Sequence, residues 1–106
     1  GKGAKIAKKC ASCHSFNKGG KNKVGPNLWN IVNQSKASVD GYKYSKALSG
    51  YGGAWDWDAL NGFLANPKAY VKGTKMAYAG LKKDGDRAAM LVYLRSLSET
   101  PADLPN

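Results

Sequence analysis

The sequence is poor in metal-binding side chains and in acidic residues. Its 106 residues include one histidine, two cysteines and seven acids. A structural zinc site usually takes four cysteine or histidine ligands, so a zinc ion here would need a carboxylate or a water as well. No apolar run reaches the roughly 18 residues of a membrane-spanning helix. The opening stretch GKGAKIAKKC also lacks the apolar core of a signal peptide.

Positive charge is what the chain has in excess. It carries 17 lysines and arginines and a formal net charge of +10, and ten of the lysines lie within residues 1–46 beside a single acid, Asp40. Such a surface attracts nucleic acid, anionic lipid or the acidic face of another protein, unless it serves only solubility. We recognise no nucleic-acid reading helix or stacking platform, so nucleic acid is not an expected partner.

Apolar spacing predicts two clear helices in the second half of the chain. The first follows Asp56, its expected N-cap, and ends before Pro67. After an irregular segment over 67–83, the second begins at Asp84 or Asp86. Its apolar stripe consists of Met90, Leu91, Leu94 and Leu97.

The first half of the chain is less regular. Residues 3–13 are compatible with a helix that would bring Cys10 to the core. Loops rich in glycine and asparagine are expected over 16–28 and 49–55, with a short helical turn over 44–48 between them. No alternating run of β-branched residues indicates a sheet.

The stretch KKCASCHSF, residues 8–16, places two thiols two residues apart and an imidazole directly after them. Zinc and a Cys10–Cys13 disulfide are two possible outcomes, although a redox disulfide usually sits at a helix start within a strand-helix pattern. The third is haem. C-x-x-C-H is the attachment signature of c-type haem, in which both thiols bond to the porphyrin and the histidine ligates iron. A covalently held macrocycle would also add apolar bulk to a small core.

A haem iron bound by His14 has one further axial position. Because His14 is the only histidine, a second histidine ligand is excluded, which leaves a thioether, a lysine amine, a tyrosine or an open site. Met90 lies in the apolar stripe of the last predicted helix, where methionine usually fills the core. Met76 lies in the irregular stretch VKGTKMAYAG and on no amphipathic face, so it is the stronger candidate.

Four motifs in this order, CASCH, VGPNL, ANPKAYVKGTKMAYAGL and DRAAMLVYLRSL, resemble those of a class I c-type cytochrome over residues 3–98. The likeness is to the group of mitochondrial cytochrome c, bacterial cytochrome c2 and alphaproteobacterial cytochrome c-552. It implies an all-α, single-domain fold with three main helices and irregular loops wrapped around one covalently bound haem. We expect this domain at 1–98, followed by a Pro-rich tail at 99–106.

The resemblance also implies a role for individual residues. Cys10 and Cys13 would form the thioether bonds, and His14 and Met76 would be the iron ligands. The carbonyl of Pro26 would orient the imidazole. Three further side chains would hydrogen-bond a haem propionate: Tyr44, Thr74 and Trp55. The alternatives are that Trp55 is an ordinary core aromatic and Tyr44 an exposed one.

Other positions fit or depart from the family pattern. Gly3 and Tyr93 match the close crossing of the first and last helices. Gln34 stands where relatives usually carry an arginine near a propionate, Leu48 replaces a usual asparagine, and Phe63 replaces a usual tyrosine. The region around the thioether should therefore be less polar than in relatives.

The function implied by the resemblance is one-electron transfer in a respiratory or photosynthetic chain, without enzymatic activity. The donor would be a bc1-type complex and the acceptor a terminal oxidase or an equivalent. Five lysines would ring the exposed haem edge and bind acidic faces of these partners: Lys9, Lys23, Lys68, Lys75 and Lys82. The alternative function is a haem peroxidase or gas-binding sensor in which Met76 is labile.

The chain begins without methionine, so we expect a processed or excised form. The sequence does not distinguish a cleaved leader from a membrane anchor upstream of Gly1. The stretch TPADLP is similar to the tail of membrane-anchored bacterial members of the group. We expect a monomer in the bacterial periplasm, either soluble or tethered. The mitochondrial intermembrane space is the alternative.

Overall fold

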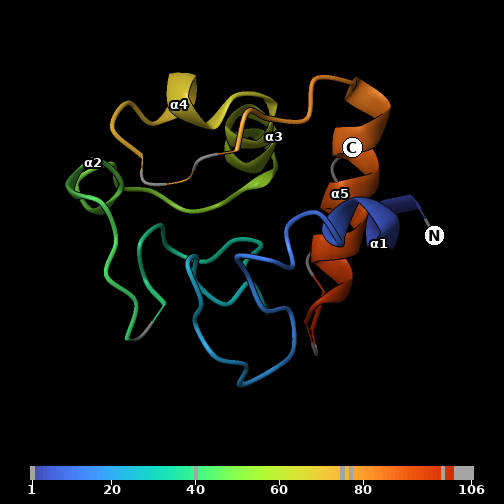
Figure 1. The fold of residues 1–106 in the computed structure, drawn as a ribbon, viewed down its shortest axis with the longest axis horizontal. Coiled ribbons are helices and arrows are strands. Elements are labelled where there is room, and N and C mark those ends of the chain that lie inside the picture. The colour runs from blue at the N-terminus through green and yellow to red at the C-terminus, as the bar shows by residue number, and fades with distance from the viewer. Residues whose placement is uncertain (1, 40, 75, 77, 99, 102–106) are drawn as a thin grey trace.

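A computed structural model of the chain describes residues 2–39, 41–74, 76, 78–98 and 100–101. The helices in this part of the chain are α1 (Lys2–Ala7), α2 (Lys46–Ser49), α3 (Trp57–Ala65), α4 (Pro67–Tyr70) and α5 (Asp84–Ser96) (Figure 1). No strand occurs in the described residues, where only an isolated antiparallel bridge joins Ser35 to Ala54. The fold is therefore all-α, and α1, α3 and α5 are its three longer helices.

Local capping explains where α3 and α4 begin. Asp56 is the N-cap of α3, as predicted, and its carboxylate accepts a hydrogen bond from the amide of Ala59 at 2.9 Å. Asn66 caps α4 in the same way, while Pro67 occupies the first turn, where its missing N–H costs nothing. The segment after Asn66, expected to be irregular, thus opens with one helical turn.

The helix α5 begins at Asp84, one of the two positions predicted for its start. Its N-cap is Lys83, whose side chain makes no capping hydrogen bond. Asp84 and Asp86 lie one position and three positions later, in the first turn. Negative charge there still stabilises the helix, because the unpaired N–H groups give that end a partial positive charge.

The first helix is shorter than predicted and ends at Ala7. Beyond it the backbone continues in tight turns, with hydrogen bonds from the amide of Cys10 to the Ala7 carbonyl at 2.9 Å and from the amide of Cys13 to the Cys10 carbonyl at 3.0 Å. Four-residue bonds, to the same two carbonyls from the amides of Ala11 at 3.1 Å and His14 at 2.9 Å, occur beside them, so residues 8–13 form successive turns and no continuous helix. The two cysteines therefore lie on turns and not on the helix itself.

The first and last helices cross closely (Figure 1). A Cβ added to Gly3 would overlap the carbonyl oxygen of Ala89 and lie 2.8 Å from the Cβ of Tyr93. Only glycine allows the two backbones to approach this far, as the pairing of Gly3 with Tyr93 predicted. Lys2 and Asp86 add an ion pair of 3.0 Å across the same crossing.

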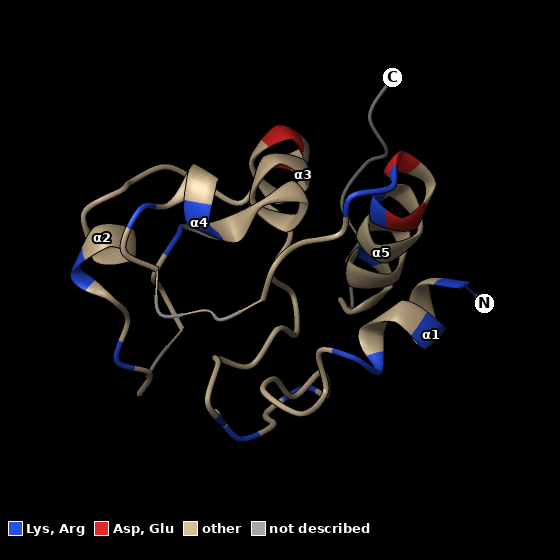
Figure 2. Ribbon diagram, turned by 45° about the horizontal axis from the view of Figure 1, so that its top comes forward, with Lys and Arg blue, Asp and Glu red and all other residues tan. Residues whose placement is uncertain are grey.

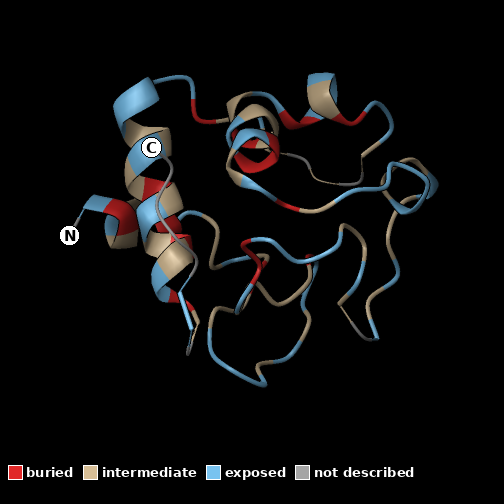
Figure 3. Cartoon of the chain, turned by 180° about the vertical axis from the view of Figure 1, so that it is seen from behind, coloured by how far each residue is buried: buried red, intermediate tan, exposed pale blue. Residues whose placement is uncertain are grey.

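The buried residues lie on segments around the middle of the molecule (Figure 3), and most of them are apolar. One cluster of them comes from α1, α3 and α5 and from the segments before α3 and at both ends of α5. It contains Ala7, Ile31, Val32, Trp55, Ala59, Leu60, Leu64, Leu81, Met90, Leu94 and Leu97. Of the predicted α5 stripe, Met90 and Leu94 are buried and Leu91 is half-buried. None of the helices in the described residues has the length and apolar character needed to cross a bilayer.

The predicted division into a domain at 1–98 and a tail at 99–106 stays a prediction. Residue 99 and residues 102–106 of that tail lie outside the described residues.

Candidate functional site

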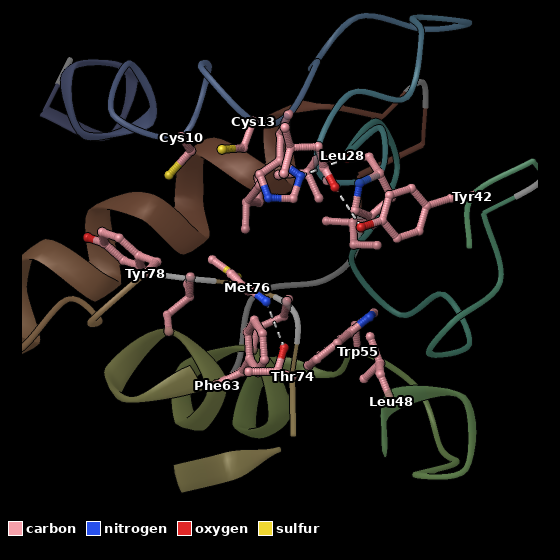
Figure 4. Close-up of a pocket in the computed structure, with 18 of the residues that line it drawn as sticks. Cys10, Cys13, Leu28, Tyr42, Leu48, Trp55, Phe63, Thr74, Met76 and Tyr78 are labelled. Carbon is pink, nitrogen blue, oxygen red and sulfur yellow. Dashed lines mark hydrogen bonds between the residues drawn. The ribbon is translucent and has the colours of Figure 1, made fainter. Parts of the chain in front are cut away.

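A cavity of about 360 Å³ lies at the centre of the fold (Figure 4). This volume falls in the range of small-molecule and cofactor sites. Apolar side chains make most of its wall, among them Leu28, Ile31, Leu48, Leu60, Phe63 and Leu64. The core described above thus surrounds a space shaped for an apolar guest.

The eight residues predicted to bind the cofactor all line this one cavity: Cys10, Cys13, His14, Pro26, Tyr44, Trp55, Thr74 and Met76. They come from segments spread over most of the chain, so only the folded chain brings them together. Cys10 and Cys13 lie on one side of the space, and Thr74 and Met76 lie on the opposite side (Figure 4).

The two cysteines are half-buried and are not joined to each other. Burial raises the pKa of Cys10, the neighbouring Cys13 raises it further, and Lys9 opposes the change. Cys10 is therefore a protonated thiol at neutral pH. In the described residues no group of three histidine, cysteine or acidic side chains could hold a metal ion, so the zinc alternative lacks a ligand set.

His14 is buried, with 9% of its surface exposed. Its Nδ1 atom lies 2.7 Å from the carbonyl oxygen of Pro26. A carbonyl can only accept, so Nδ1 carries the hydrogen and Nε2 keeps a lone pair. Burial lowers the pKa of His14, against the smaller opposing effect of the Pro26 hydrogen bond. The ring is thus neutral at neutral pH, the form in which imidazole binds metals.

Gly25 is a site residue that sequence reasoning missed. It is buried, and a Cβ on it would lie 2.7 Å from Nδ1 and 2.8 Å from Nε2 of His14. The glycine lets the loop pass against the face of the ring and present the next carbonyl, that of Pro26, to Nδ1. Its place directly before Pro26 in VGPNL was the only signal in the sequence.

Both thioethers reach the cavity, although their surroundings differ. Met76 is half-buried, and its amide donates to the hydroxyl oxygen of Thr74 at 3.3 Å. Met90 also lines the cavity, but it is 1% exposed and belongs to the packed core of α5. Met90 is therefore buried core, as its helical spacing indicated.

Two of the predicted polar side chains are held firmly in the wall. The hydroxyl oxygen of Tyr44 accepts a hydrogen bond from the amide of Val39 at 3.0 Å, and burial raises the pKa of Tyr44. Trp55 is 6% exposed and packs against Phe63 with ring centroids 5.1 Å apart. Tyr44 is half-buried, so it is not an ordinary exposed tyrosine, and Trp55 belongs both to the core and to the cavity wall.

The three departures from the family pattern do not share one location. Leu48 and Phe63 line the cavity, and both lie on the Thr74 side of it (Figure 4). Gln34 is exposed and is not part of the wall. The backbone of Gln34 does contact a wall residue, because its carbonyl accepts a hydrogen bond from the amide of Trp55 at 2.7 Å.

The lysines predicted to bind a partner are in different situations. Lys9 lines the cavity, and Lys68 is exposed on α4. Lys23 and Lys82 are exposed but held, because their ammonium groups donate to the carbonyls of Ala11 at 2.9 Å and Ala65 at 2.8 Å. The fifth, Lys75, lies outside the described residues.

Charge is unevenly distributed over the described surface (Figure 2). Its acidic residues all lie at the starts of α3 and α5: Asp56, Asp58, Asp84 and Asp86. Lysines occupy α1, α2, α4 and the loops between the helices.

A family model described as Cytochrome c matches residues 1–98. The chain belongs to the cytochrome c family. Members of this family carry haem c bonded through a cysteine pair, and Cys10 and Cys13 are that pair here. The cavity fits this group, because its wall is apolar, both thiols lie on one side of it, and a buried neutral imidazole stands in the same wall.

Curated proteins of the family support the assignment over most of the chain. A cytochrome c homolog from Bradyrhizobium diazoefficiens is 50% identical over 105 residues, 98% of this chain and 57% of that protein. A cytochrome c homolog from Rickettsia typhi is 51% identical over 94 residues, 89% of this chain and 54% of that protein. Cytochrome c from Theileria annulata is 49% identical over 98 residues, 92% of this chain and 84% of that protein. The chain thus spans little more than half the length of the bacterial relatives.

Proposed function

We propose that this chain is a one-electron carrier whose haem iron is bound by His14 and Met76. The observation that supports the proposal is that a thiol pair, a buried neutral imidazole and a thioether all line one apolar cavity. Haem c supplies an iron that alternates between the ferrous and ferric states, and no substrate is transformed. The activity is therefore electron transfer and not enzymatic catalysis.

The protein's contribution is to orient the two ligands and to exclude water. The Pro26 carbonyl holds the hydrogen of His14 on Nδ1, which leaves Nε2 as the ligating atom. Met76 approaches from the side opposite the cysteines. The thioether of Met76 would favour the ferrous state of a bound haem iron and raise its reduction potential, and together with His14 it would keep oxygen and peroxide from the metal.

Polar groups in the wall would bind the charged edge of the cofactor. We assign Tyr44, Thr74 and Trp55 as hydrogen-bond donors to the propionates. Tyr44 is already fixed by the amide of Val39, and this accepted bond leaves its own hydroxyl hydrogen to donate. A buried propionate would otherwise be costly in so apolar a cavity.

The partners proposed for the carrier are acidic faces of a bc1-type complex and of a terminal oxidase or equivalent. The basic surface supports this, with Lys9 at the cavity and Lys23, Lys68 and Lys82 exposed. Lys75 is included on the family resemblance alone. We place the protein in the bacterial periplasm as a monomer, soluble or tethered, with the mitochondrial intermembrane space as the alternative.

A second function, peroxide chemistry or gas binding, depends on how firmly Met76 is held. Met76 lies outside the helices and is only half-buried, whereas Met90 is locked in α5. If Met76 leaves the iron readily, an external ligand takes its place. The two functions therefore differ in the stability of a single ligand bond.

The test compares Met76→Ala with Met90→Ala. Met76→Ala should remain covalently red, lose the far-red absorption of ferric thioether ligation, show a lower reduction potential and bind carbon monoxide rapidly. Met90→Ala should keep that absorption and only destabilise the protein, by about 2–5 kcal/mol as for other buried methionines. Retention of the far-red absorption by Met76→Ala would refute the ligand assignment.

A further inference from the structure

The segment that carries Met76 runs from the end of α4 to the start of α5, and its C-terminal end is tied to other elements. The amide of Leu81 donates to the carbonyl of Leu64 at 2.7 Å. The ammonium of Lys82 donates to the carbonyl of Ala65 at 2.8 Å. Both carbonyls belong to the last turn of α3, whose carbonyls have no partner within the helix.

Arg87 also binds the C-terminal end of the segment that carries Met76. Its Nη1 atom donates to two consecutive carbonyls of the segment, that of Leu81 at 2.8 Å and that of Lys82 at 3.0 Å. Its Nε atom donates to the side-chain oxygen of Asn61 on α3 at 2.9 Å, and its Nη2 atom pairs with Asp84. One guanidinium thus links the segment, α3 and α5.

The burial of Arg87 indicates that these contacts are held. Its side chain is 13% exposed, whereas that of its ion-pair partner Asp84 is 94% exposed. An exposed ion pair contributes little, so the salt bridge is not what holds the guanidinium in place. The fixed fork of a guanidinium can serve several acceptors at once, which a lysine ammonium on a flexible chain cannot do with the same geometry.

The N-terminal part of the segment is attached differently. Between described residues, the amide of Thr74 donates to the carbonyl of Val71 at 3.1 Å, and the amide of Met76 donates to the hydroxyl of Thr74 at 3.3 Å. These hydrogen bonds stay close in sequence and do not join Met76 to α3 or α5. Among the described residues of the segment, the hydrogen bonds to α3 and α5 lie on the C-terminal side, where Arg87 acts.

We propose that Arg87 is a positioning residue for Met76. By holding the carbonyls of Leu81 and Lys82 against α3 and α5, it limits the movement of Met76 away from the cavity. It thereby sets how readily an external ligand replaces the thioether, and so whether the chain remains a closed carrier. This inference rests on the proposed function in one respect, namely that Met76 is the iron ligand.

The experiment uses the haem-loaded protein with Arg87→Gln, Arg87→Lys and two controls. Asp84→Asn removes only the exposed partner of Arg87. Gly3→Ala disturbs the α1–α5 crossing and lowers global stability without touching the Met76 segment. The measurements are the rate of carbon monoxide binding to the ferrous protein at saturating gas, and amide hydrogen exchange at Leu81, which reports local opening of the segment.

Arg87→Gln should raise the binding rate about tenfold or more, because a hydrogen bond from a charged donor is worth at least that factor. Exchange at Leu81 should accelerate in parallel. Arg87→Lys should fall between the wild type and Arg87→Gln, since an ammonium can satisfy one of the two carbonyls. Asp84→Asn should match the wild type in both measurements, and Gly3→Ala should leave the binding rate unchanged.

Two outcomes would overturn the inference. One is an Arg87→Gln protein, or an Arg87→Lys protein if Arg87→Gln does not fold, that binds carbon monoxide at the wild-type rate. The other is an equal acceleration in Gly3→Ala, which would make the effect one of global stability. The variant Met76→Ala separates the role of Arg87 from the proposed function. If Met76→Ala binds carbon monoxide rapidly while the Arg87 variants bind it at the wild-type rate, the positioning role of Arg87 is refuted and the assignment of Met76 as iron ligand stands.

Discussion

The backbone of Gly25 lies directly against the imidazole ring of His14. The position that a Cβ would take on Gly25 is 2.7 Å from Nδ1 and 2.8 Å from Nε2, well inside van der Waals contact. The next residue, Pro26, presents its carbonyl oxygen to Nδ1 at 2.7 Å. Two adjacent residues of one loop therefore set both the position of the ring and the atom that carries its hydrogen.

Gly25→Ala should displace either the ring or the loop. We expect a loss of about 1–3 kcal/mol in the free energy of unfolding, as for other overpacked sites, and less covalently attached haem per chain. Denaturant unfolding and the haem absorbance per protein measure the two effects. Gly85→Ala is the control: its nearest neighbour is Lys2 Nζ at 3.7 Å, and alanine favours the helix there. Equal stability of the two variants would contradict the contact.

Leu48→Asn tests the apolar character of the cavity wall. Leu48 lines the cavity, so an amide there loses water without a partner that the wall provides. We expect the free energy of unfolding to fall by about 1–3 kcal/mol. Gln34→Arg, at an exposed position outside the wall, should stay within about 0.5 kcal/mol of the wild type.

The variant Gln34→Arg also tests the effect of the arginine that the family pattern has at this position. Because Gln34 does not line the cavity, Gln34→Arg should leave the pH dependence of the reduction potential unchanged. Potentiometric titration measures this directly. A flatter pH dependence in Gln34→Arg would show that a side chain at this position reaches the propionates.

Lys36 is held by aromatic rings in a way that its sequence position did not indicate. Its ammonium lies 4.9 Å from the ring centroid of Tyr51 and 5.1 Å from that of Trp55, and it donates to the carbonyl of Gly52 at 3.2 Å. Lys36→Gln should therefore destabilise the protein by about 1–2 kcal/mol, the range for a partly desolvated cation over aromatic rings. Lys46→Gln, at an exposed site, is the control in the same unfolding experiment.

The ion pair between Lys2 and Asp86 makes a pH-dependent contribution. The hydrogen bond from Lys2 lowers the pKa of Asp86 below its ordinary 3.8. A lowered pKa means that the stabilisation is present above that ordinary value and is lost as the pH falls through the folded pKa. In a double-mutant cycle of Lys2→Gln and Asp86→Asn, the coupling should be favourable at pH 7 and absent below the folded pKa. A coupling that persists in acid would contradict the charge pairing.

Docking through the cavity side predicts a difference between two neighbouring lysines. Lys9 lines the cavity and Lys5 is exposed on α1, so Lys9→Glu and Lys5→Glu change the net charge equally at different places. Electron transfer to an acidic oxidase should slow more for Lys9→Glu, and the gap should narrow in high salt, because rim charges act on the rate of association. Equal slowing would mean that only the overall charge matters.

Features that depend on neighbouring residues were readable in the sequence. Cys10, Cys13 and His14 lie within five positions, so the attachment motif is complete without any tertiary contact. Asp56 caps α3 through an amide three residues away, which makes that boundary a local property. The apolar stripe of α5 likewise follows from helical period alone.

The tertiary structure decided what depends on how distant segments meet. Gly25 lies against His14 because a distant loop packs on the ring, and Arg87 reaches Asn61 because α5 packs beside α3; no local propensity encodes those approaches. The early end of α1 at Ala7 is likewise a tertiary feature, since the turns that follow bring both cysteines to the cavity wall. Burial of apolar surface around the cavity sets these positions, because it acts on the whole chain at once, whereas caps and helical periods act within a few residues.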